Sequence, residues 1–219
     1  MSVVELSSIK KNLAISRSII YDFLSSLYLY PYNLDDYSKF VKSKIPVVKD
    51  AVKGLGSIYD FSELVDVIAY AERVNDYDAL TEIEVDLTKV DYGVPPYEGY
   101  IHRGYFDVGV EAMVNSIYSE FGMGVNKGFR DLRGDHIVVE LSFMSYLAYK
   151  SYEDFKDYGR YLDAEVSFLT NHLAVWVPIF VTRALNLKLK TEYVKGILRF
   201  TKSFIQKDKE VLHDLRDLP

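Results

Sequence analysis

Apolar side chains recur three or four positions apart along most of the chain, which is the spacing of one face of an α-helix. The first such stretch covers residues 7–30 and ends before Pro31, because the residue ahead of a proline disfavours helical backbone angles. The same spacing predicts further helices at residues 33–42, 46–54, 61–73, 77–90, 106–121, 135–149, 152–173 and 191–211. No stretch shows the alternation of a β-strand. The pattern predicts an all-α fold, a single-domain bundle of about ten helices over residues 1–219.

Three segments interrupt this pattern. Residues 91–105 read DYGVPPYEGYIHRGY, where two prolines and three glycines oppose a regular helix. Residues 174–189 contain Pro178 and separate the last two long helices. Residues 122–134 read GMGVNKGFRDLRG and are rich in glycine. We expect this last segment to be a hinge between two halves of the domain, so that the protein is a monomer or a dimer that exchanges halves.

The helix predicted from residue 135 begins in the sequence GDHIVVELSFM. Asp135 is a good N-cap residue, because its carboxylate can accept a hydrogen bond from a backbone N–H without a partner in the helix. Asp135 and His136 are therefore expected to be exposed at the mouth of a buried helix. One interpretation is a capped helix with a surface histidine, and the other is a polar recognition point.

Composition narrows the class of protein. The chain has 219 residues, 49% of them hydrophobic, with 19 Tyr and 12 Phe, so much of its core or of a groove is aromatic. It has no Cys, which excludes disulfides and thiolate metal sites. The net charge of −6 argues against a nucleic-acid partner but fits a basic peptide. No apolar run approaches the roughly 18 residues of a membrane span, and the N-terminus does not resemble a signal peptide, so we expect a cytoplasmic protein.

Motifs for catalysis are weak. The loop GMGVNKG follows a predicted helix rather than a strand, and Lys127 precedes a glycine, so it does not match a phosphate-binding loop. His136 and Glu140 have the spacing of two metal ligands on a helix, yet a surface pair is the simpler interpretation. His172 and Trp176 lie one helical turn apart, which indicates either core packing or the wall of a groove. We therefore expect no enzyme activity, no metal and no cofactor.

Six stretches occur in an order that resembles a known family. They are FLSSLYLYP at 23–31, EIEVDLTKV at 82–90, VPPYEGY at 94–100, GDHIVVELSFM at 134–144, FLTNHLAVW at 168–176 and FIQKDKEVL at 204–212. Together they resemble the TorD/DmsD/NarJ family of redox-enzyme maturation chaperones over nearly the whole chain. The Pro-Pro-Tyr-Glu loop, followed about forty residues later by Asp-His, is the most specific part. Gly134 departs from the family, which usually has proline before Asp-His.

The resemblance implies an all-α, TorD-like fold and a cytoplasmic chaperone without enzymatic activity. Members of the family bind molybdopterin oxidoreductase catalytic subunits or their twin-arginine signal peptides, and delay export until the cofactor is loaded. Some form domain-swapped dimers, and weak guanine-nucleotide binding has been suggested for some. The resemblance assigns recognition to Tyr97, Glu98, Asp135 and His136.

A receptor for an arginine-bearing peptide needs carboxylates that pair with guanidinium groups and an aromatic groove for the apolar residues. The expected peptide-binding residues are Tyr97, Glu98, Tyr100, Asp135, His136, Glu140, His172 and Trp176. Further carboxylates are expected from Glu82, Glu84 and Asp86, and further aromatic rings from Tyr92 and Tyr105. The alternatives are a helical adaptor for another peptide partner and, with less support, a hydrolase or nucleotide-dependent enzyme.

Overall fold

The computed structural model describes residues 3–29, 34–124 and 132–218. In this part of the chain every regular element is helical. The α-helices are α1 (Val3–Tyr28), α2 (Leu34–Leu55), α3 (Ser62–Arg73), α4 (Tyr77–Gly93), α5 (Glu98–Arg103), α6 (Val108–Glu120), α7 (Ile137–Glu153), α8 (Tyr158–Phe168), α9 (Ala174–Leu185) and α10 (Glu192–Asp217). A 3₁₀ turn, Phe155–Asp157, precedes α8, and a π-helix, Leu169–Leu173, joins α8 to α9. The all-α prediction is confirmed.

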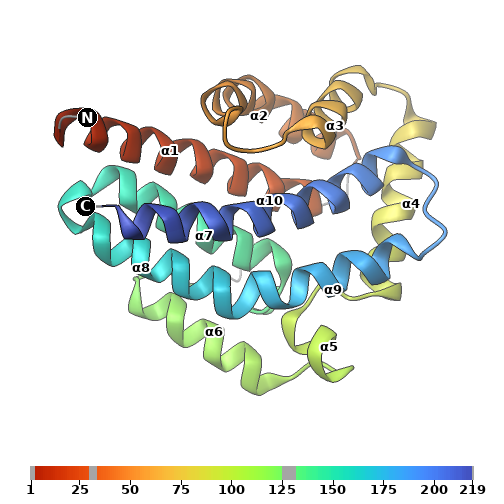
Figure 1. Cartoon of the computed structure of the whole chain (residues 1–219). Coiled ribbons are helices and arrows are strands. Elements are labelled where there is room, and N and C mark those ends of the chain that lie inside the picture. The colour runs from red at the N-terminus through yellow and green to blue at the C-terminus, as the bar shows by residue number, and fades with distance from the viewer. Residues whose placement is uncertain (1–2, 30–33, 125–131, 219) are drawn as a thin grey trace.

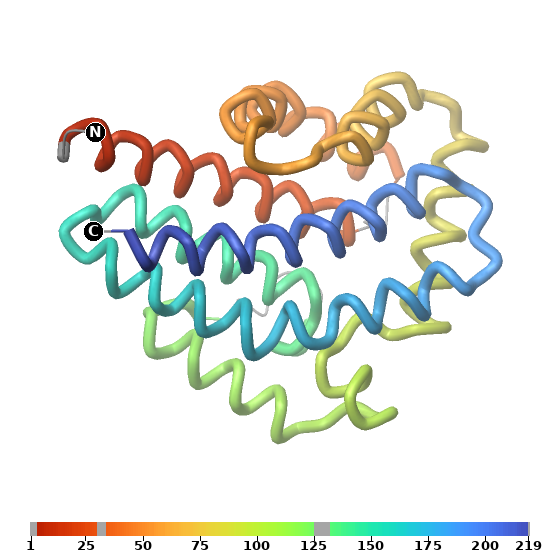
Figure 2. The backbone as a smooth tube through the Cα atoms, in the orientation of Figure 1, coloured from red at the N-terminus to blue at the C-terminus, as the bar shows by residue number. Residues whose placement is uncertain are grey.

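The long helices α1, α7 and α10 organise the packing. Helix α1 lies against α2 and α7, while α10 packs on α3, α8 and α9. Helices α2 and α3 lie on one side of the molecule and α5 and α6 on the opposite side (Figure 1). The first turn of α1 and the last turn of α10 lie at the same end (Figure 2). The buried apolar residues of α1 to α10 form one core cluster, which includes Trp176.

Serines allow α1 and α7 to approach closely. The Ser18 hydroxyl donates to the Ser145 carbonyl at 2.9 Å, and the Ser145 hydroxyl donates to the Ser18 carbonyl at 2.9 Å. Further along the same helix pair, the Ser25 hydroxyl of α1 donates to the Val138 carbonyl of α7 at 3.1 Å. These small side chains satisfy their own polar atoms inside the contact, so the two helices pack without an unpaired hydroxyl.

A buried ionic network ties α1 to α10 and α8. The guanidinium of Arg17 binds both carboxylate oxygens of Asp208, at 2.6 and 2.9 Å, and also contacts Glu165. The hydroxyls of Tyr21 and Tyr59 donate to the same Asp208 carboxylate. All of these charged side chains are buried, and removing one partner of such a pair typically costs about 3–5 kcal/mol. The network therefore fixes how the three helices are aligned.

Two expected helix breaks are wrong, because prolines fall inside continuous helices. The segments predicted separately at 33–42 and 46–54 form the single helix α2. Pro46 lies on its exposed side, while the opposite face packs on α1, so burial of that face outweighs one missing hydrogen bond. Likewise α8, the π-helix and α9 run on through Pro178. Four residues before Pro178 the backbone has the hydrogen-bond pattern of a π-helix, since the Ala174 N–H donates to the Leu169 carbonyl.

Residues 91–105 are less irregular than expected. Helix α4 continues to Gly93, and α5 occupies 98–103 between the two prolines and Gly104. Gly104 ends α5 with φ of 79°, a left-handed conformation that glycine adopts without steric cost. The expected hinge at 122–134 lies partly outside the described residues, since 125–131 are not among them. The hinge and the exchange of halves therefore stay predictions.

One helical stretch, Phe155–Leu185, is long and apolar enough by length and composition to cross a membrane. In this fold 56% of its most apolar window is buried inside the protein. Trp176 and Phe180, both fully buried, lie on this stretch. It is a core helix of the bundle.

Candidate functional site

The two motifs of the sequence meet in space at the start of α7. An isolated antiparallel bridge joins Tyr97 to His136, and the Glu98 N–H donates to the Asp135 carbonyl at 2.9 Å. The Ile137 N–H, in turn, donates to the carbonyl of the second proline in the loop at 2.9 Å. The backbone of the Pro-Pro-Tyr-Glu loop is therefore hydrogen bonded to the residues that precede α7, as in a short antiparallel pair of strands.

The expectation that Asp135 is an exposed N-cap is wrong. His136 is the N-cap residue, and its Nδ1 accepts from Val138 N–H at 3.2 Å. The Asp135 side chain is fully buried instead. Its carboxylate accepts from the Gly99 N–H at 3.2 Å and pairs with Arg133 Nε at 3.0 Å. The Asp135 carboxylate therefore binds the Gly99 N–H, 36 positions away in the sequence, instead of a backbone N–H in the first turn of α7.

The positive charge of Arg133 compensates the Asp135 carboxylate inside the protein. Burial raises the pKa of Asp135 above its ordinary value, while the hydrogen bond and charge of Arg133 act in the opposite direction. The same guanidinium pairs with Glu111 at 3.1 Å and donates to the carbonyl of Asp107 at 2.8 Å. Arg133 therefore occupies the position in which we expected an arginine of a bound peptide.

Four further residues of the expected site also lie together, and all are buried. His172 Nδ1 lies 2.9 Å from a carboxylate oxygen of Glu98. The indole N–H of Trp176 donates to Glu140 at 2.9 Å. Burial raises the pKa of Glu140 well above its ordinary value, and the negative charge of Glu98 adds to this, although the Trp176 hydrogen bond lowers it. The surface pair expected for His136 and Glu140 is wrong, and core packing of His172 and Trp176 is confirmed.

We refer to Glu98, Asp135, His136, Glu140, His172 and Trp176 as the buried motif cluster. These residues join α5 to α7 and to the π-helix between α8 and α9. They fasten the elements to one another and leave no carboxylate of the cluster facing solvent.

Gly134 has a packing reason for departing from proline. A Cβ at this position would lie 2.1 Å from Asn115 Oδ1, far inside van der Waals contact. The Gly134 carbonyl also accepts from the Tyr118 hydroxyl at 2.8 Å. The turn is therefore closely packed against α6 rather than loosened.

Aromatic and apolar side chains, exposed or partly exposed, follow the cluster's Pro-Pro-Tyr-Glu loop from Tyr97 to Met113. The ring of Phe106 lies 5.1 Å from that of Tyr97 and 5.4 Å from that of Tyr100, and Tyr97 packs edge-on against His136 at 4.6 Å. Burial raises the pKa of Tyr97 to about 12, so its hydroxyl stays protonated. The α5–α6 surface, as we call it, comprises Tyr97, Tyr100, Tyr105, Phe106, Val108 and Met113.

Sequence analysis missed three members of the α5–α6 surface: Phe106, Val108 and Met113. They are 49%, 73% and 47% exposed. A signal was present in the sequence, because most residues in the first half of α6 are apolar. Only two of its residues, Val114 and Tyr118, are buried. An apolar helix with so small a covered face leaves hydrophobic surface open to a partner.

Of the acidic residues on α4, Asp86 is not available to a partner, whereas Glu82 and Glu84 keep exposed or partly exposed side chains. Asp86 is fully buried and accepts from the backbone N–H groups of Lys190 and Thr191 at 2.8 and 2.7 Å, at the entry to α10. Glu82 is exposed and lies 3.6 Å from the Lys190 ammonium. Asp86 therefore positions α10, contrary to the expectation that it faces a peptide.

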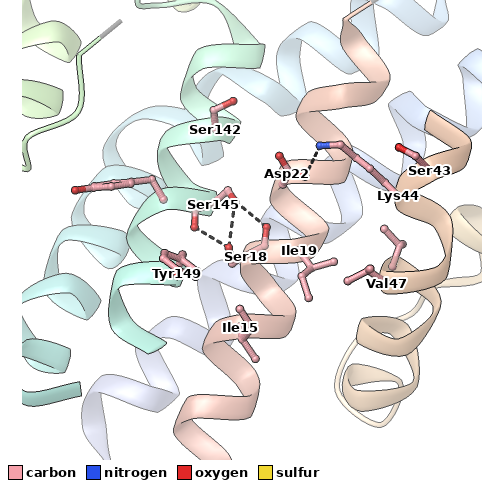
Figure 3. Close-up of a pocket in the computed structure, with 12 residues that line it drawn as sticks. Ile15, Ser18, Ile19, Asp22, Ser43, Lys44, Val47, Ser142, Ser145 and Tyr149 are labelled. Carbon is pink, nitrogen blue, oxygen red and sulfur yellow. Dashed lines mark hydrogen bonds and ion pairs between the residues drawn. The ribbon is translucent and has the colours of Figure 1, made fainter. Parts of the chain in front are cut away.

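Two hollows flank these elements. The α6–α8 cavity, of about 530 Å³, is lined by Ile117, Glu120, Phe121, Arg160, Asp163, Ala164, Ser167, Phe168 and His172. A groove of about 500 Å³ lies between α1, α2 and α7. Figure 3 shows its floor, where Ser18 and Ser145 are hydrogen bonded, and the Asp22–Lys44 ion pair across one end. Among the described residues no group of three metal-ligating side chains lies together.

Comparison with known proteins agrees with this architecture. The family described as "Nitrate reductase delta subunit" matches residues 90–182, from the end of α4 to α9. Proteins named "Chaperone protein TorD" from strains of Vibrio cholerae serotype O1 are 25% and 24% identical over 209 residues. The match covers 91% of this chain and 93% of each relative. No solved structure matches the chain.

The family match and the TorD relatives indicate a redox-enzyme maturation chaperone, a class of proteins that assists molybdoenzymes. Residues 90–182 match the nitrate reductase delta subunit family, and the chain is similar over 91% of its length to TorD chaperones. TorD chaperones are cytoplasmic. The matched range includes every residue of the buried motif cluster.

Proposed function

We propose that this chaperone acts in the cytoplasm and binds the twin-arginine signal peptide of a molybdopterin oxidoreductase catalytic subunit, or that subunit itself. It thereby delays export until the cofactor is loaded. The observation that carries the proposal is the α5–α6 surface. A group of exposed and partly exposed aromatic and apolar side chains within one segment of a helical bundle is typical of a site for an apolar peptide.

The family motif supports this surface from beneath. Asp135 binds the first turn of α5 through Gly99 and holds Arg133, whose guanidinium carbon lies 5.6 Å over the Phe106 ring. The His136 ring likewise supports the surface, because it packs edge-on against the Tyr97 ring. We therefore assign the buried motif residues to positioning, and the exposed rings above them to contact with the client.

The test is the affinity of the full-length protein for a synthetic peptide with two adjacent arginines before an apolar segment, measured by isothermal titration. The double variant Phe106→Ser/Met113→Ser removes apolar contact from two exposed positions and should weaken binding by about tenfold or more. The control is the single variant Val47→Ser on α2, a helix on the opposite side of the molecule (Figure 1), where the Val47 side chain is 53% exposed. Equal affinities of the double variant and the control would contradict the proposed surface.

A further inference from the structure

The α6–α8 cavity lies at the far end of the same helix that carries the exposed apolar surface. Its aromatic wall is formed by Phe121 and Phe168, and two carboxylates, Glu120 and Asp163, lie at its rim. At about 530 Å³ it falls within the usual size of a ligand pocket, roughly 300–1,000 Å³. An opening of this kind accommodates a side chain that is flat, apolar on its faces and positive at its edge.

The two rim carboxylates are available to a partner. Glu120 and Asp163 are exposed, and no basic side chain among the described residues lies within ion-pair distance of either. This distinguishes them from Asp135, which is paired with Arg133, and from Asp22 in the α1–α2–α7 groove, which is paired with Lys44. Of the two hollows near the family motifs, this one therefore offers carboxylates that form no ion pair with the described residues.

The wall of the cavity already packs against a guanidinium. The guanidinium carbon of Arg160 lies 5.2 Å over the ring of Phe121 and 5.9 Å over that of Tyr161. Arg160 is exposed and forms no ion pair with the described residues. Aromatic faces attract guanidinium groups through their quadrupole, so the intramolecular contact shows which chemistry the wall accepts.

A buried polar side chain closes the inner end of the cavity. The side chain of His172 is 6% exposed, and its Nδ1 is bound to Glu98. None of the described residues hydrogen-bonds its Nε2. The π-helix places His172 here, and π-helical turns are frequent at functional sites. Through this ring the cavity is connected to the buried motif cluster.

We infer that the α6–α8 cavity binds an arginine side chain of the client segment, with Glu120 and Asp163 pairing with the guanidinium and Phe121 packing on its face. This inference rests on the proposed function and places the arginine at the opposite end of α6 from the aromatic rings. Val108 and Glu120 are separated by about 18 Å along the helix axis. An extended segment of roughly five residues spans that distance, so arginine and apolar residues of one peptide can occupy both ends.

The experiment uses the full-length protein and three synthetic peptides that share one apolar segment and differ in the preceding pair, Arg-Arg, Lys-Lys or Gln-Gln. The double variant Glu120→Gln/Asp163→Asn should lose about tenfold or more in affinity for the Arg-Arg peptide at low salt. It should bind the Gln-Gln peptide as the parent does. Arg160→Gln removes the intramolecular competitor and should tighten binding of the Arg-Arg peptide, a gain that loss of folding cannot produce.

The control is the double variant Asp50→Asn/Glu72→Gln, which makes the same change in net charge on α2 and α3, on the opposite side of the molecule (Figure 1). It tests whether the effect is local or reflects overall charge. If the Arg-Arg peptide binds the parent and the cavity variant equally well, the arginine site is wrong and the proposed function stands. If the parent binds none of the three peptides, the arginine site and the signal-peptide part of the proposed function are both overturned, and binding of the catalytic subunit itself is the part that stands. Equal affinity of the parent for Arg-Arg and Gln-Gln would also overturn the arginine site.

Discussion

The buried motif cluster and the α5–α6 surface are neighbours, yet the cluster encloses charged groups while the surface leaves apolar groups open to solvent. The cluster contains three carboxylates, and all of them are enclosed and engaged by partners within the chain. The surface contains rings and aliphatic side chains that face solvent. The comparison shows that most residues assigned by the family resemblance are buried, with Tyr97 as the partly exposed exception, whereas the neighbouring apolar side chains are open to solvent. Substitutions should therefore separate stability from binding.

The largest expected effect is on folding. Trp176→Ala removes a fully buried indole and the N–H that binds Glu140, and should lower the free energy of unfolding by about 3–5 kcal/mol. Urea denaturation measures the change. A loss below about 1 kcal/mol, in the range of a surface substitution, would contradict the assignment of Trp176 to the core.

The next effect concerns the turn that enters α7. Gly134→Ala places a Cβ where Asn115 Oδ1 lies, so overpacking should cost about 1–3 kcal/mol. Gly159→Ala on α8 is the matched control, because a Cβ there meets nothing within 4 Å. That control should stabilise the helix by about 0.5–1 kcal/mol. Adding Asn115→Ala to Gly134→Ala should recover stability if the clash is the cause.

A third effect depends on pH. The pKa of Glu140 is higher in the folded protein than its ordinary value of 4.5. The protonated Glu140 side chain therefore contributes fully to the free energy of unfolding below pH 4.5, and this contribution is lost as the pH rises through the pKa of the folded state. Glutamine is neutral throughout and keeps an acceptor for the Trp176 N–H. Glu140→Gln should therefore be more stable than the parent at pH 7, with an advantage that shrinks towards pH 4.5. An advantage that grows on acidification would show that Glu140 is ionised in the folded state.

The smallest effect on folding is expected at the surface. Met113→Ser alters a side chain that is 47% exposed, and should change the free energy of unfolding by no more than about 0.5 kcal/mol. The same variant should still bind the arginine-bearing peptide more weakly than the parent. Thermal unfolding and titration on one preparation measure both. A large loss of stability would show that Met113 belongs to the core, and would contradict the distinction between the buried motif cluster and the α5–α6 surface.

Apolar spacing in the sequence was sufficient to predict an all-helical protein, because a helix buries the same face every three or four residues wherever it packs. The sequence also predicted that His172 and Trp176 can pack in the core. It could not predict that α2 continues through Pro46. That outcome depends on whether the proline faces solvent or the neighbouring helix, and thus on the direction in which α2 lies on α1.

The state of the candidate site was decided by tertiary contacts. Asp135 has the local features of an N-cap, but its partners are Arg133 and the backbone of Gly99, which lies 36 positions earlier. Glu98 is paired with His172, 74 positions away. Local sequence shows that a carboxylate is present, whereas its burial and its partners depend on which distant segments fold against it. For the same reason, which apolar residues of α6 stay exposed depends on how the neighbouring helices pack.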